Sequence, residues 1–235
     1  MQILKQTRAA IKPVPIVFLF AVYLIYGAFF GSEFLPKPDY MQRGCENFGK
    51  SKFKDAIKDF NHVIENDPNN CVGYWGRGLT EKYLHQYPEA FQDLTTAIEK
   101  NPNVADLYAL RADICNCQEK WTQAMNDINE AIAMNPTDSL YYCTRSKTYS
   151  ETKKHALALK DANKALQFKP NSSEAFRRRA FVKWRDCDLQ GAVDDFDKAY
   201  KSDKTDLRNI SARKSVQEML EYCKMKGIPL ESLRD

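Results

Sequence analysis

The hydrophobic and polar positions of the chain follow two different patterns. From residue 37 to residue 206, small and aromatic residues return every 34 residues at helical spacing, which predicts a series of amphipathic helix pairs. Residues 13–31, in contrast, run without a single charged side chain. The first pattern predicts an all-α repeat domain, and the second predicts a separate apolar segment that precedes it.

Five units of 34 residues follow one another without insertion or deletion. They span 37–70, 71–104, 105–138, 139–172 and 173–206. In each unit the first helix carries an aromatic residue and, four places later, a small one, while the second helix repeats alanine at helical spacing. Small residues let helices approach closely, and aromatic ones fill the space between them. A proline ends each of the first four units because it cannot extend the second helix.

The period, the small residues and the terminal proline recur in phase, and together they resemble the tetratricopeptide repeat family. The resemblance implies a right-handed superhelix of five helix pairs with a concave groove lined by the first helices. The fifth unit has Lys204 in place of the proline. An amphipathic segment follows at 207–227, which we expect to be a helix that caps the last repeat, and residues 228–235 form a tail.

Each unit also contains one arginine in its first helix and one aspartate in its second. The arginines are Arg43, Arg77, Arg111, Arg145 and Arg179, continued by Arg213, and the aspartates are Asp59, Asp93, Asp127, Asp161 and Asp195. The arginines could bind an acidic ligand, but we favour a structural ladder, because a buried guanidinium needs a carboxylate. If the pairs form within each unit, no aspartate of the series remains for Arg213, and if they form across unit boundaries, none remains for Arg43. The persistence of the column at Arg213 slightly favours pairing across the boundaries.

The resemblance further implies which side chains line the groove, because fixed places on the first helices face it. The predicted groove residues are Met41, Phe48, Trp75, Leu79, Lys82, Tyr83, Asp113, Lys147, Arg177, Phe181, Trp184 and Arg185. They are apolar and aromatic in the first repeats and basic and aromatic in the last, which suits a protein segment. The alternative is that Phe48 and Trp184 turn inward as core. No register of three repeats supplies the Lys, Asn and Arg set with which relatives hold heat-shock carboxylates.

The N-terminal pattern predicts a membrane anchor. Residues 1–32 contain no acidic side chain, and 13–31 would form a helix of roughly 28 Å, close to the thickness of a bilayer core. We therefore expect a basic segment at 1–12, an uncleaved transmembrane helix at 13–31 and a linker at 32–38. A cleaved signal peptide is disfavoured because no small-residue cleavage motif ends the stretch, and a buried core helix is the other alternative.

The charge pattern around this segment predicts its orientation. Basic residues precede it, so the positive-inside rule places the N-terminus on the cytoplasmic or matrix side and the repeats on the opposite side. We favour the mitochondrial inner membrane, with the endoplasmic reticulum and the bacterial inner membrane as alternatives.

Composition offers little chemistry beyond this. The net charge of +4 is mixed in sign along the chain, which does not indicate nucleic-acid binding. The seven cysteines are scattered without a CxxC pair, and we expect free thiols. The three histidines are isolated, and neither a glycine-rich phosphate loop nor a metal-ligand spacing occurs. We therefore expect no catalytic site, no metal and no cofactor.

These observations predict a non-enzymatic protein–protein interaction scaffold. The expected setting is a larger membrane complex, of which the chain is a subunit or an assembly factor. The expected partners are the other proteins of that complex and, through residues 13–31, the lipid bilayer. The alternative is a receptor or adaptor that binds extended segments of translocating proteins.

Overall fold

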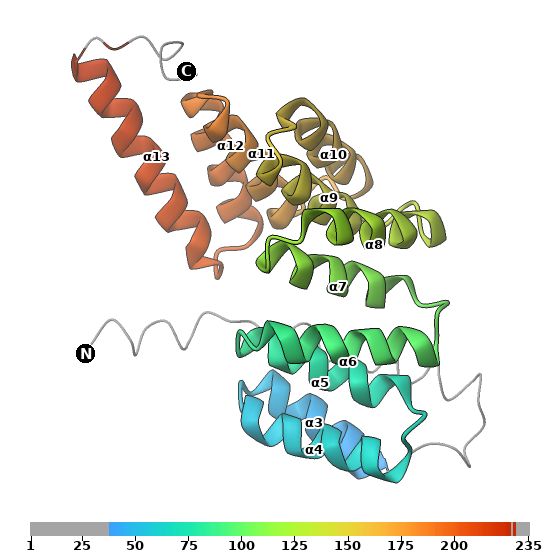
Figure 1. The fold of residues 1–235 in the computed structure, drawn as a ribbon. Helices are drawn as coiled ribbons and strands as arrows, with labels where there is room; N and C mark the ends of the chain where they lie inside the picture. Colours follow the sequence, from blue (N-terminus) through green and yellow to red (C-terminus); the bar gives the residue numbers. More distant parts are fainter. Residues whose placement is uncertain (1–37, 227, 229–235) are drawn as a thin grey trace. The chain divides into compact units, whose positions relative to one another are not determined.

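Every regular element in the described part of the chain, residues 38–226 and 228, is an α-helix in the computed structural model (Figure 1). The all-α class predicted from the sequence is therefore confirmed. The chain divides into two units, residues 1–120 and 121–235. The boundary falls between the two helices of the third repeat.

The first unit builds its core between successive helices. Its described helices are α3 (Pro38–Gly49), α4 (Phe53–Asn66), α5 (Cys71–Tyr83), α6 (Tyr87–Lys100) and α7 (Ala105–Cys117). Each helix packs against the next one along the chain. A Cβ atom on Gly76 of α5 would lie 2.5 Å from Cε1 of Phe60 on α4, so only glycine permits this approach. Phe60, Leu94 and Ile114 are almost fully buried in the resulting core.

The second unit continues the same alternation and adds one longer helix. Its helices are α8 (Trp121–Met134), α9 (Ser139–Glu151), α10 (His155–Phe168), α11 (Ser173–Arg185), α12 (Leu189–Ser202) and α13 (Leu207–Lys226). Val216 and Leu220 of α13 are buried against Leu189 and Phe196 of α12. The helix α13 therefore covers the apolar side of the last repeat, which solvent would otherwise contact.

A left-handed residue ends the first helix of every repeat. Ser51, His85, Glu119, Lys153 and Cys187 have φ between 57° and 61° and are spaced by 34 residues. This conformation reverses the chain within a short turn, so that the second helix packs back on the first. None of the five is a glycine, and each left-handed residue costs roughly 1 kcal/mol. The packing of the two helices offsets that cost.

The membrane location predicted from the sequence is contradicted by the helices that the structure describes. Within residues 38–226, no helix is both long enough and apolar enough to cross a bilayer. The predicted anchor at 13–31 lies outside the residues that the structure describes.

Candidate protein-interaction surface

The arginine column forms the same ion pair in the first, second, fourth and fifth repeats. Nε of Arg77 donates to Asp93 Oδ2 at 2.6 Å, and its Nη2 donates to Oδ1 at 2.7 Å. The same contacts join Arg145 to Asp161 and Arg179 to Asp195, and Arg43 binds Asp59. The aspartates are buried, with at most 6% of the residue exposed. A planar guanidinium that binds a carboxylate through two donors satisfies both buried oxygens.

The aromatic residue three places before each arginine completes this motif. The guanidinium carbons of Arg43, Arg77, Arg145 and Arg179 lie 4.9 to 5.7 Å from the ring centres of Tyr40, Tyr74, Tyr142 and Phe176. Arg111 lies 5.8 Å from the ring of Tyr108 in the same way. A cation above a ring face is attracted by the ring's quadrupole. The aromatic residue therefore holds the guanidinium from one side while the carboxylate holds it from another.

The arginines also reach the preceding repeat, through a column of residues that the sequence analysis did not identify. Nη1 of Arg77 donates to Asn61 Oδ1 at 2.7 Å, and Nη1 of Arg145 donates to Asn129 Oδ1 at 3.0 Å. The equivalent acceptors are Thr95 for Arg111 and Asn163 for Arg179. Each of these arginines therefore joins its own repeat to the one before.

This geometry corrects the preference for pairing across repeat boundaries. In the four repeats for which the contact is given, the aspartate partner lies in the same repeat as the arginine. The contact across the boundary exists but involves a different residue. Arg213 continues the column because it keeps this second contact, through an ion pair with Asp197 of α12.

One position beside the buried aspartates differs between repeats, and the difference changes the local charge. Four residues after the arginine, Asn47 donates to Asp59 at 2.8 Å, and Lys183 forms an ion pair with Asp195 at 2.9 Å. The second repeat has Glu81 there, only 9% exposed, and its Oε2 has no hydrogen-bond partner in the described residues. Burial, together with the charge of Asp93, raises the pKa of Glu81 to about 8.

In the first unit, the structure corrects three of the predicted groove residues. Met41, Phe48 and Trp75 are only 4 to 5% exposed and belong to the hydrophobic core of that unit. Phe48 packs edge-on against the ring of Tyr83, with ring centres 5.1 Å apart. These side chains cannot contact a partner because neighbouring helices already cover them. Leu79 and Tyr83 are half-buried against the same core.

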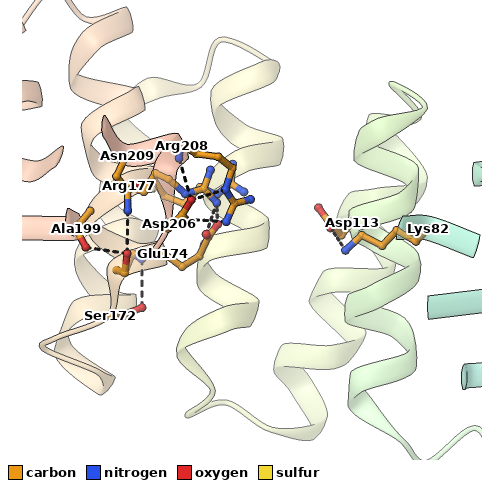
Figure 2. A network of polar contacts seen from close by, with 12 residues as sticks. Lys82, Asp113, Ser172, Glu174, Arg177, Ala199, Asp206, Arg208 and Asn209 are labelled. Carbon is orange, nitrogen blue, oxygen red and sulfur yellow. Dashed lines mark hydrogen bonds and ion pairs between the residues drawn. The ribbon is translucent and has the colours of Figure 1, made fainter. Parts of the chain in front are cut away.

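Two other predicted groove residues of the first unit bind each other. Lys82 Nζ of α5 lies 2.6 Å from Asp113 Oδ2 of α7, and about a quarter of each side chain is exposed (Figure 2). Burial disfavours the charged ammonium, but the Asp113 carboxylate outweighs this effect, so the pKa of Lys82 is raised. The pair ties the first helices of two adjacent repeats together.

In the second unit, the start of α11 carries a charged cluster. Glu174 accepts a hydrogen bond from Arg177 (Figure 2) and another from Arg178, the latter at 2.6 Å. Burial opposes ionisation of Glu174, but the two guanidinium groups prevail and lower its pKa to about 2. Arg177 is 8% exposed, and its Nε has no hydrogen-bond partner in the described residues. Burial, with the charges of Arg178 and Arg208, lowers the pKa of Arg177.

The middle and end of α11 present aromatic and basic side chains. Phe181 and Trp184 are half-buried and stacked, with ring centres 6.1 Å apart. Arg185 follows on the same side of the helix, with 42% of its side chain exposed. It forms an ion pair with Glu151 of α9 at 2.9 Å and donates to the carbonyl oxygen of Ser150 at 2.9 Å. Lys147, one turn before Ser150, is half-buried.

These side chains lie on two helices that pack against each other, and all of them are at least partly exposed except Arg177, a predicted groove residue that the structure buries beneath the others. We call the residues Lys147, Glu151, Glu174, Arg177, Arg178, Phe181, Trp184 and Arg185 the α9–α11 surface. Five of them are among the groove residues given above, whereas Glu174 and Arg178 were not predicted to line the groove. The run of three arginines at 177–179 was the available signal, since one arginine of the ladder accounts for only one of the three.

Comparisons with known proteins support the tetratricopeptide resemblance. Residues 140–172 match the family model of the tetratricopeptide repeat. No curated protein sequence matched the chain. The family match lies in the second unit and covers the helices α9 and α10.

Solved structures show the same fold. TTC0263, a tetratricopeptide protein of Thermus thermophilus, is similar with a TM-score of 0.69 and 16% identity, over 76% of this chain and 97% of that one. MamA is similar with a TM-score of 0.57 and 21% identity, over 70% of this chain and 96% of that one. YrrB, a tetratricopeptide protein with an unusual peptide-binding site, has a TM-score of 0.55 and 16% identity, over 80% and 97%. The chain therefore has the fold of proteins built from tetratricopeptide repeats.

Proposed function

We propose that this protein is a protein–protein interaction scaffold that holds a segment of a partner protein on the α9–α11 surface, as a subunit or assembly factor of a larger complex. The fold supports this proposal because tetratricopeptide proteins generally mediate protein–protein interactions and are generally not enzymes. The particular surface is chosen for its side chains, since a fold alone does not define a partner.

The stacked pair Phe181 and Trp184 is the observation on which the proposal rests. Both rings keep part of their surface exposed on α11, whereas the predicted groove aromatics Phe48 and Trp75 are buried. Aromatic residues beside arginine are the side chains that most often dominate binding at protein interfaces. Because the helix already fixes the rings, binding costs little side-chain entropy.

The charges around these rings indicate the chemistry of the partner. The helix α11 carries five basic side chains and one carboxylate. Three carboxylates pair with the five: Glu174, Asp195 and Glu151. The positive charge therefore exceeds the negative charge, and an apolar segment flanked by acidic residues fits this surface best.

The proposal is tested by co-purification of the tagged full-length chain with variants in the α9–α11 surface. We expect partners that remain bound to the wild type to be lost with R178E/W184A, because the change removes a ring and reverses a charge. The matched control is Q190A, an exposed position on α12. Equal recovery of every partner with R178E/W184A and with Q190A, both variants being folded by circular dichroism, would contradict the proposal.

A receptor or adaptor that transiently binds extended segments is the second candidate function. The similarity to YrrB, which has a peptide-binding site, favours it. Size-exclusion chromatography of the native protein separates the two candidates. A scaffold subunit elutes with its partners in a stable large complex, and a transient receptor elutes mostly as the free chain.

A further inference from the structure

A second surface, on the helix α10, differs from its counterparts in the other repeats. Leu157, Lys160, Lys164 and Phe168 follow one another at helical spacing along one side of the helix, next to the side that carries the buried residues Ala158 and Ala162. Leu157 and Phe168 are 43% and 41% exposed. Lys153 and Lys154 precede the helix, and Lys169 follows it. We call these seven side chains the α10 surface.

The repeat itself supplies the comparison that makes this surface unusual. In each of the other repeats, the residues 34, 68 or 102 places away occupy the same structural positions. They are mixed in sign and mostly polar. The charged ones are Lys52, Asp55, Lys58 and Asp67 in the first repeat, Glu89 and Lys100 in the second, Glu119, Lys120 and Glu130 in the third, and Asp188, Asp194, Lys198 and Asp203 in the fifth, and the one large apolar residue is Met134 in the third. The fourth repeat has five lysines and two large apolar residues there. Helix folding does not require this pattern, because the other four repeats fold without it.

The lysines of the α10 surface also lack partners of opposite charge. No ion pair within residues 38–226 joins any of the five to a carboxylate, although Lys164 lies 4.5 Å from the ring centre of Tyr142. The one carboxylate on α10 belongs to Asp161, which is buried and bound by Arg145. Within residues 38–226, no ion pair therefore neutralises the positive charge of this surface.

We propose that the α10 surface binds an acidic segment of another protein, one that also carries apolar side chains for Leu157 and Phe168. These two residues lie 11 positions apart, about 16 Å along the helix, with Lys160 and Lys164 between them. A narrow segment laid along α10 meets apolar contacts at both ends and positive charge in the middle. This surface is formed by a second helix of a repeat and is separate from the first-helix residues of the α9–α11 surface.

A flat anionic surface fits less well than a narrow segment. The helices α8 and α12 flank α10, because Arg145 joins α8 to α10 and Arg179 joins α10 to α12. At the positions of Lys160 and Lys164 they carry two exposed carboxylates, Glu130 and Asp194, and one exposed lysine, Lys198. A bilayer or a nucleic-acid duplex wide enough to span the three helices would meet this mixed charge on both flanks, whereas a narrow segment along α10 meets only its lysines.

The experiment measures fluorescence anisotropy of a labelled 15-residue peptide of glutamates with three leucines at helical spacing, added to the full-length chain. The test variant is K160E/K164E. The matched control is K58E/K198E, which changes two lysines at the same two repeat positions, on α4 and α12, and alters the net charge equally. We expect K160E/K164E to weaken binding by about tenfold or more at low salt and K58E/K198E to weaken it by less than about twofold.

Three further measurements make the test decisive. Circular dichroism establishes that each variant is folded, and K160Q/K164Q replaces the test variant if it is not. L157S/F168S is expected to weaken binding of the leucine-containing peptide and to leave an all-glutamate peptide unaffected. Phosphatidylserine vesicles and a 15-nucleotide single-stranded oligothymidylate are titrated in parallel. Equal weakening by the two charge variants, no binding of the peptide, or tighter binding of vesicles or oligonucleotide than of the peptide would each overturn the proposal.

Discussion

Replacing Asp161 with alanine removes both carboxylate acceptors of Arg145. In the structure, Arg145 Nε and Nη2 donate to this carboxylate at 2.7 and 3.0 Å, and Asp161 is 4% exposed. The contact with Asn129 at 3.0 Å remains, but two guanidinium donors lose their acceptors. The variant therefore tests whether the repeated ion pair holds adjacent helices together.

The expected size of the effect follows from burial. Removing one partner of a buried ion pair costs about 3–5 kcal/mol, because the other charge stays uncompensated. One fifth of the Arg145 side chain is exposed, so water replaces part of the lost interaction. We expect a loss of about 2–3 kcal/mol in the free energy of unfolding, which corresponds to a Tm lowered by about 5–10 °C in a domain of this size.

Thermal and urea unfolding, followed by circular dichroism at 222 nm, measure this loss. The control is D194A, which removes an exposed aspartate of α12 whose hydrogen bond to Gln190 is also exposed. The double variant R145M/D161L replaces the pair by apolar side chains and is expected to lose less stability than D161A alone. A Tm of D161A within about 1 °C of the wild type would refute the structural role of the ladder, as would equal losses in D161A and D194A.

Three further predictions concern titration and thiol reactivity. Glu81 has a folded-state pKa raised to about 8, so folding favours its protonated form and stability falls as pH rises from about 4.5 to 8. E81Q should therefore raise the Tm at pH 8 and change it little at pH 4.5, which calorimetry at the two pH values measures. Glu174 has a folded-state pKa lowered to about 2, so the stability that its carboxylate contributes is present above pH 4.5 and is lost as pH falls towards 2. E174Q should lower the Tm at pH 7 and reduce the fall in Tm between pH 4.5 and 3, and an unchanged dependence of Tm on acid pH would contradict this role of Glu174. Cys117 is the one exposed thiol among the seven cysteines, whereas burial raises the pKa of Cys45 and Cys143 to about 12. A colourimetric thiol reagent at pH 8 should therefore react rapidly with about one thiol per chain, and C117S should abolish that fast phase.

Most of the secondary structure could be predicted because the repeat provides the same information five times. The terminal prolines and the periodic alanines indicate where the second helices lie and which side of them is buried, since alanine permits close packing and proline ends a helix. The left-handed residues such as Ser51 and Glu119 could not be predicted, because serine and glutamate have no preference for that conformation. These residues adopt the left-handed conformation because the two packed helices impose the geometry of the turn that joins them.

The candidate surface was predicted less well than the fold, for a physical reason. Phe48 and Trp184 lie four periods of 34 residues apart and so occupy the same place in the repeat, a first-helix position expected to face a groove. Phe48 is buried because the core side chains of the first unit pack against it, whereas Trp184 stays half-exposed beside Phe181. Burial depends on the size of the side chains that neighbouring helices bring, and a single repeat does not encode these.

The sequence by itself determined that this protein is an array of helix pairs, and that each repeat carries one arginine matched by one aspartate. Spacing alone could not decide the pairing, since an arginine lies 16 residues before one aspartate and 18 residues after another. The tertiary structure decided it: the packing of each helix pair brings the aspartate of the same repeat to Nε and Nη2, and the preceding repeat supplies a different acceptor to Nη1. A guanidinium has donors on two edges, so one side chain can serve both contacts, and only the positions of three helices in space show which edge meets which acceptor.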